Sequence, residues 1–125
     1  MIRNVLLVGL GGGVGSMARY LCQKWFGDNY SGTFPWGTFA VNITGCFLIG
    51  LVYAIAEKTT LLSPQTRLLL ITGLCGGFTT FSAFAFENMT FLRSGDTLYF
   101  LLYSIGSVVL GIGAVFAGFA IIKLL

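Results

Sequence analysis

The chain contains no histidine, and only 9% of its 125 residues are charged. The absence of histidine excludes all histidine-based catalysis and most transition-metal sites. The carboxylates are few and dispersed along the chain, at Asp28, Glu57, Glu87 and Asp96. Because no two of them form a paired general acid and base, the composition argues against an enzyme.

The shortage of charge also argues against a soluble fold. A soluble domain has about 25% charged residues, whereas this chain is 56% apolar and has a mean hydropathy of +0.90. Four apolar runs remain between the charges, near residues 4–26, 36–56, 68–92 and 98–122. Each can cross about 30 Å of hydrocarbon as a helix, which takes about 20 residues. We expect an all-α membrane protein in which residues 1–125 form one domain of four transmembrane helices.

The cysteines and the net charge argue against a zinc site and against nucleic acid as a partner. The three cysteines, Cys22, Cys46 and Cys75, lie inside apolar runs without C-x-x-C spacing, so neither a disulfide framework nor a zinc site is predicted. The net charge of +3 is spread over chain ends and loops, which argues against nucleic acid as a partner.

Four short helices are too few to enclose a roomy cavity, so we expect an oligomer.

The third run holds the most informative segment, from Gly73 to Ser82. Three glycines and three hydroxyl residues stand in the middle of what would otherwise be one helix. Each glycine disfavours a helix by about 1 kcal/mol, and hydroxyl groups can replace lost backbone hydrogen bonds. We therefore expect the helix to break near residues 75–80. A break at membrane depth frees carbonyl groups that must be buried in protein, line a wet path or bind an ion.

Other residues in the runs are candidates for either packing or function. Asn42 places an amide in hydrocarbon, where it could join two helices or line a polar path. Phe81 and Phe84 share one helical face, an arrangement that by itself is typical of packing. Tyr103 and Ser107 share a face of the last run.

The first run combines glycines with a charged residue, Arg19, which we expect near the far membrane interface. Its glycines include two overlapping G-x-x-x-G spacings, Gly9 with Gly13 and Gly11 with Gly15, which let helix backbones approach closely in lipid. Arg19 lies within the same run and costs at least a few kcal/mol unless it finds an acceptor or reaches the interface. Glu87, near the end of the third run, is one candidate partner for it.

The basic residues near helix ends divide almost evenly between two sides, with Arg3, Lys58, Arg67 and Lys123 on one and Arg19, Lys24 and Arg93 on the other. Because the distribution of Lys and Arg sets orientation, the chain is predicted to insert both ways. Two copies in opposite orientations would form an antiparallel, dual-topology homodimer, analogous to the inverted repeats of many transporters.

Three segments together resemble the bacterial fluoride channel family known as Fluc or CrcB. They are Gly15 to Arg19 in the first run, Trp36 to Asn42 with Gly45 and Gly50 in the second, and Gly73 to Phe84 in the third. The glycine, threonine and phenylalanine pattern from Gly76 to Phe84 is the most specific of them. With four helices in a chain of this size, the resemblance covers essentially the whole sequence.

The resemblance implies a passive fluoride channel of the bacterial inner membrane that relieves fluoride toxicity. It implies a dual-topology homodimer with two pores and a central structural sodium ion, bound by backbone carbonyls of Gly76 and Thr79. The pore residues it implies are Asn42, Phe81 and Phe84, with Thr80, Ser82, Tyr103 and Ser107 on or near a polar track. One departure is Gly111, where many relatives extend the track with a hydroxyl.

Two other functions fit the same residues. A non-conducting assembly subunit of a membrane complex would also have glycine-rich helices, few charges and no catalytic groups. A small cation-coupled exporter would carry its substrate rather than conduct it. The rate of transport separates a channel from a carrier, and the assembly subunit alone would pass no ions.

Overall fold

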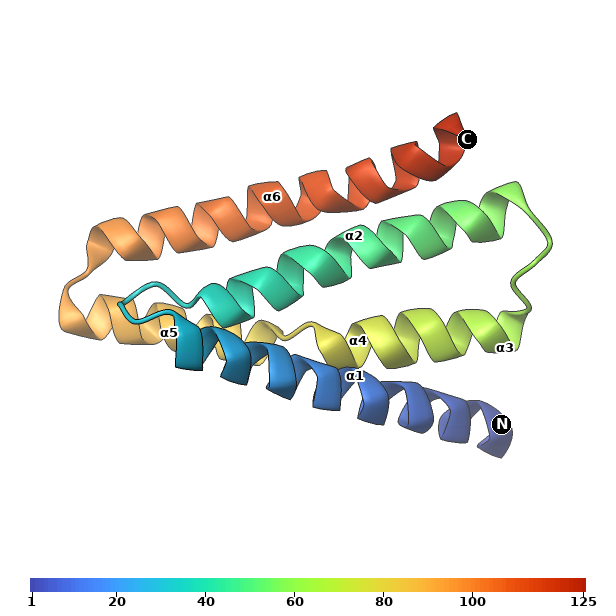
Figure 1. Ribbon diagram of the computed structural model, residues 1–125, viewed down its shortest axis with the longest axis horizontal. Helices are drawn as coiled ribbons and strands as arrows, with labels where there is room; N and C mark the ends of the chain where they lie inside the picture. Colours follow the sequence, from blue (N-terminus) through green and yellow to red (C-terminus); the bar gives the residue numbers. More distant parts are fainter.

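A computed structural model describes residues 1–125 as an all-helical bundle (Figure 1). Four helical segments are long and apolar enough to cross a membrane: Ile2–Asn29, Trp36–Lys58, Pro64–Ser94 and Thr97–Leu124. Both termini lie at the same end of the bundle (Figure 1), as an even number of crossings requires. The first, second and fourth segments are the single helices α1 (Ile2–Asn29), α2 (Trp36–Lys58) and α6 (Thr97–Leu124).

The third segment is divided, as the sequence predicts. It begins with the short helix α3 (Pro64–Arg67) and continues through wide π-helical turns in η1 (Leu68–Cys75) and one turn of α4 (Gly76–Phe78). The chain is then extended at Thr79 and Thr80 before α5 (Phe81–Ser94) begins. The π-helical turns were not predicted, because hydropathy and glycine content do not distinguish them from ordinary helical turns.

Local sequence explains where the parts of this segment begin and end. The Ser63 hydroxyl accepts a hydrogen bond from the Thr66 N–H, and Pro64 occupies the first turn of α3, where a missing N–H costs nothing. Gly95 ends α5 in the left-handed conformation at φ 80°, which only glycine adopts without penalty. A tight connection through Asp96 then starts α6 antiparallel to α5.

Glycines set the closest helix contacts. A Cβ atom on Gly11 or Gly15 of α1 would overlap backbone carbonyls of the third segment. Gly50 of α2 and Gly118 of α6 likewise lie against each other's helix backbone. The predicted role of the first-run glycines is therefore confirmed for Gly11 and Gly15. Gly9 and Gly13 meet nothing within 4 Å in the chain, so for this pair the role stays a prediction.

Most apolar side chains point outward. Only 14 of the 125 residues are buried, and the largest fully buried side chains are those of Tyr103 and Val41. Many long apolar residues on α1 and α6 are more than half exposed, as expected where lipid or a second protein surface takes the place of water.

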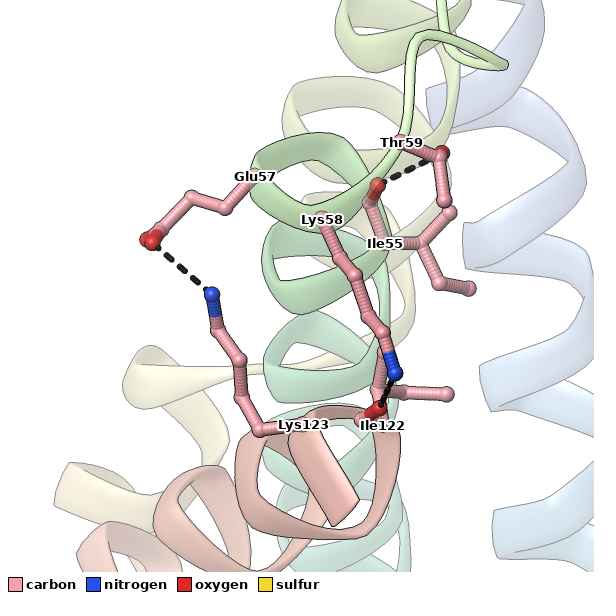
Figure 2. A network of polar contacts seen from close by, with 6 residues as sticks. All are labelled: Ile55, Glu57, Lys58, Thr59, Ile122 and Lys123. Atoms are coloured by element: carbon pink, nitrogen blue, oxygen red, sulfur yellow. Dashed lines mark hydrogen bonds and ion pairs between the residues drawn. The ribbon is translucent and has the colours of Figure 1, made fainter. Parts of the chain in front are cut away.

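Polar contacts join the ends of α2 and α6 beside the C-terminus (Figure 2). Lys123 forms an ion pair with Glu57 at 3.3 Å, and the Lys58 ammonium donates to the Ile122 carbonyl at 3.0 Å. The Ile122 carbonyl also accepts from the Leu125 N–H at 3.2 Å, so Lys58 is a second donor at the C-terminal end of α6, where a cation is favourable.

Candidate functional site

The break in the third segment forms where two glycines meet two threonines. Gly76 and Gly77 weaken the helix, and the threonine hydroxyls then supplement or replace backbone hydrogen bonds. The Thr79 N–H still donates to the Cys75 carbonyl at 3.0 Å. The Thr79 hydroxyl donates to the Cys75 carbonyl at 3.0 Å, and the Thr80 hydroxyl accepts from the Ala83 N–H at 3.2 Å. Thr80 is therefore the N-cap of α5.

Asn42 of α2 reaches the break and bonds to both backbone groups of one residue. Its side-chain oxygen accepts from the Thr80 N–H at 2.7 Å, and its amide nitrogen donates to the Thr80 carbonyl at 3.1 Å. The role of Asn42 as a link between helices is confirmed, because its amide joins two segments at the break. Since a primary amide has two N–H groups, one donor of Asn42 is left for another partner.

These hydrogen bonds change which carbonyls keep a donor. In a continuous helix the Gly76 carbonyl would accept from the Thr80 N–H, which instead donates to Asn42. The Thr79 carbonyl would accept from the Ala83 N–H, which instead donates to the Thr80 hydroxyl. The carbonyl groups of Gly76 and Thr79 are thus two of those that lose their ordinary helical donor at the break, and the Gly77 carbonyl between them accepts from Arg19.

Arg19 also binds the break. Its Nε donates to the Gly77 carbonyl at 3.0 Å, across the contact between α1 and α4. The guanidinium therefore finds its acceptor on the backbone, as its position within an apolar run requires. The suggested pairing of Arg19 with Glu87 is wrong, because Glu87 accepts from two neutral hydroxyl groups instead.

A cavity of about 310 Å³ lies beside the break, between the third segment, α2 and α6. Seven of the nine predicted site residues line it: Asn42, Gly76, Thr79, Thr80, Phe81, Phe84 and Ser107. The Phe81 ring is 78% exposed and its centroid lies 5.8 Å from that of Phe84. The Ser107 hydroxyl is buried and has no hydrogen-bond partner in the chain. A buried hydroxyl without a partner needs a hydrogen-bonding group that the chain itself does not supply.

The other two predicted site residues lie outside the cavity lining. The Ser82 hydroxyl lies 3.3 Å from that of Thr80, on an exposed part of α5. Tyr103 is fully buried, its ring centroid 5.0 Å from that of Phe84, and its hydroxyl donates to Glu87 at 2.7 Å. Tyr103 therefore joins the cavity lining to a second polar group.

That second group consists of Gln23, Thr38, Glu87 and Tyr103. The Gln23 amide donates to the Thr38 hydroxyl at 3.1 Å, and that hydroxyl donates to the other Glu87 oxygen at 2.6 Å. Gln23, Thr38 and Glu87 also line a second cavity of about 470 Å³ beneath the loop between α1 and α2. The sequence interpretation missed this network. Thr38, four residues before Asn42 on the same helical face, was the available signal.

The chemistry of the two cavities differs. The cavity beside the break is lined by amide, hydroxyl, thiol, aromatic and aliphatic groups, the last from Ile49 and Val108, and by no charged side chain. The second cavity contains the Glu87 carboxylate. No group of three or more histidine, cysteine or acidic side chains that could hold a metal ion occurs in the chain. A cation would therefore have to bind mainly to backbone oxygens.

These features define a multi-pass α-helical membrane protein whose polar groups gather at a broken helix. Residues 6–119 match the family described as CrcB-like protein, Camphor Resistance (CrcB), and the chain belongs to that family. The predicted resemblance is thereby confirmed. The family is one of ion channels and not of enzymes, and the chain is a multi-pass bacterial membrane protein.

Curated relatives named "Fluoride-specific ion channel FluC" match nearly the full chain. The protein from Leptospira interrogans is 50% identical over 121 residues, which are 97% of this chain and 95% of the relative. The protein from Chlorobaculum tepidum is 51% identical over 125 residues, 99% of this chain and 98% of the relative. The protein from Flavobacterium psychrophilum is 45% identical over 122 residues, 98% of each chain.

Proposed function

We propose that this chain forms a fluoride-selective channel that lets fluoride leave the cell passively across the bacterial inner membrane and so relieves fluoride toxicity. The cavity beside the break carries the proposal, because amide, hydroxyl and aromatic groups converge there without a charged side chain. The name of the relatives, a fluoride-specific ion channel, supports the choice of ion.

The lining suits a small anion that holds its water tightly. The free N–H of Asn42 and the hydroxyls of Thr80 and Ser107 can replace water as donors, and the positive edges of the Phe81 and Phe84 rings can face the anion. Since no fixed cation lies in the lining, each contact is weak enough to allow release. Ser82 and Tyr103 would extend the polar track at its two ends.

We also propose that a structural sodium ion binds the backbone carbonyls of Gly76 and Thr79. These two carbonyls are the ones whose helical donors bond to side chains instead. Carbonyl oxygens without donors are suitable ligands for a small hard cation. When bound, sodium would supply positive charge near the anion route and stabilise the break.

The working unit in this proposal is an antiparallel homodimer with two pores. Its support is the balance of basic residues between the two sides and the exposure of Phe81, which a second copy would cover. A reporter that is active on only one side of the membrane, fused to the C-terminus, tests the orientation. Two comparable populations are expected, and a strong one-sided signal would contradict dual topology.

Growth of bacteria that lack their own fluoride export tests the cellular function. Expression of the chain is expected to restore growth in fluoride, while a verified folded chain that leaves the cells fluoride-sensitive would contradict the proposal. The alternatives of a cation-coupled exporter and of an assembly subunit make different predictions in purified liposomes. The exporter gives slow, ion-coupled fluxes, and the assembly subunit gives none.

A further inference from the structure

Gly45 of α2 lies directly against the first residue of the break. A Cβ atom on Gly45 would overlap the Cγ2 methyl of Thr79, while the next atoms, Phe78 Cδ2 and Thr79 Cβ, would lie at 3.5 and 3.7 Å in ordinary contact. A single methyl group therefore occupies the space that any larger residue at position 45 would need.

Thr79 cannot readily turn this methyl aside. Its hydroxyl donates to the Cys75 carbonyl at 3.0 Å, which fixes the side-chain torsion and points the methyl at Gly45. Rotation about that torsion would exchange the hydroxyl and methyl positions and break the hydrogen bond. The overlap would instead push the Thr79 backbone away from α2.

Gly45 acts together with Asn42, one turn earlier on the same face of α2. Asn42 holds Thr80 through bonds of 2.7 and 3.1 Å, which are lost if the break moves outward by about 1 Å. Gly45 thus allows the break to approach α2 closely enough for the Asn42 amide to reach both backbone groups of Thr80.

We propose that Gly45 is a positioning residue for ion conduction: by receiving the Thr79 methyl, it sets the distance between α2 and the break. It acts through Thr79 and Asn42 and need not touch the ion. This inference rests on the proposed channel function and adds a residue that determines the geometry of the site.

The nature of the overlap allows a specific rescue. The overlaps at Gly11, Gly15 and Gly50 are with backbone atoms, which no side-chain substitution removes. At Gly45 the obstacle is one methyl, and Thr79→Ser deletes it while keeping the hydroxyl that bonds to Cys75. Gly45→Ala combined with Thr79→Ser should therefore fit, whereas Gly50→Ala combined with Thr79→Ser should not.

Fluoride efflux from liposomes tests this with wild type, Gly45→Ala, Thr79→Ser and the double variant, each normalised to folded protein. We expect Gly45→Ala to lower the rate about tenfold or more, and the double variant to return to within about twofold of Thr79→Ser. Gly50→Ala should not be rescued by Thr79→Ser. Gly113→Ala, where a Cβ meets nothing within 4 Å, is the matched neutral control.

Two results would overturn the inference while the wild type conducts: a Gly45→Ala rate equal to that of the wild type, or a double variant as slow as Gly45→Ala. If Gly45→Ala does not fold, the yield of folded protein becomes the readout, and Thr79→Ser must restore it. A wild type that passes no fluoride would contradict the proposed function itself, which separates the two failures.

Discussion

The third and fourth membrane segments are both long and apolar, at 31 and 28 residues, yet they handle polar groups in different ways. The fourth is one uninterrupted helix, in which Ser107 is left without a partner. The third is divided at Thr79 and Thr80, and side chains of Arg19, Asn42 and both threonines bond to the backbone at its break. The comparison indicates that backbone groups at the break, and single hydroxyls elsewhere, supply the polar surface of the cavity.

Asn42→Ala is expected to have the largest effect on the broken third segment, because it removes the side chain that hydrogen-bonds to the backbone of Thr80. With the Thr80 N–H and carbonyl left unpaired, we expect stability to fall by about 2 kcal/mol or more and fluoride efflux by about a hundredfold. Thermal unfolding and liposome efflux measure the two effects. Asn29→Ala, at the exposed end of α1, is the matched control. Normal efflux through Asn42→Ala would show that the break does not depend on its partner.

Phe81→Ile and Phe84→Ile test the aromatic part of the same cavity. Isoleucine keeps apolar bulk but lacks a positive ring edge, so we expect fluoride efflux to fall by about tenfold while the oligomer survives. Efflux and gel filtration are the measurements. Phe116→Ile, on an exposed part of α6, should change neither. Unchanged efflux in both cavity variants would remove the phenylalanines from the pathway.

Two serines of α6 test whether a hydroxyl with a partner in the chain and one without have different roles. Ser104 donates to Asn88 at 3.0 Å, whereas Ser107 has no partner in the chain. Ser104→Ala should therefore cost about 1 kcal/mol of stability with little effect on efflux. Ser107→Ala should cost no stability and lower efflux by about threefold if its hydroxyl contacts the anion. Equal effects of the two substitutions on both quantities would contradict this distinction.

Lys123→Ala is expected to have the smallest effect. Its ion pair with Glu57 joins the ends of α2 and α6 (Figure 2). The two side chains are 40% and 61% exposed, and both residues are distant in sequence from Thr79 and Thr80. The expected loss is below about 1 kcal/mol, with unchanged efflux. A large loss of efflux would show that the helix ends are coupled to the cavity.

Much of the fold follows from the sequence because hydrocarbon imposes strict limits on length and charge. The four apolar runs and the division of the third could be read from hydropathy and from Gly76 and Gly77. The sequence does not show which glycines of α1 contact the third segment. Gly9 and Gly11 both begin a G-x-x-x-G spacing, and they differ only in that Gly11 lies on the side of α1 that faces the third segment. The π-helical turns of η1 could not be predicted either, because the spacing of apolar residues does not distinguish them from α-helical turns.

The candidate site was predictable where a residue type is costly in lipid. Asn42 and the hydroxyls near the break stood out for that reason, and the structure brings most of them to one cavity. The acceptor of Arg19 was not predictable, because a freed backbone carbonyl leaves no trace in the side-chain sequence. The network of Thr38 and Glu87 was missed because a carboxylate within an apolar run is expected to pair with a cation. The Glu87 carboxylate instead accepts hydrogen bonds from the hydroxyls of Thr38 and Tyr103.

The most direct test of the account is fluoride and chloride efflux from liposomes that contain only the purified chain, compared with protein-free liposomes. The account predicts rapid fluoride release with little chloride release, because small donors and ring edges replace the water of fluoride and fit larger anions poorly. No fluoride release from verified folded protein, or equal release of both anions, would contradict it.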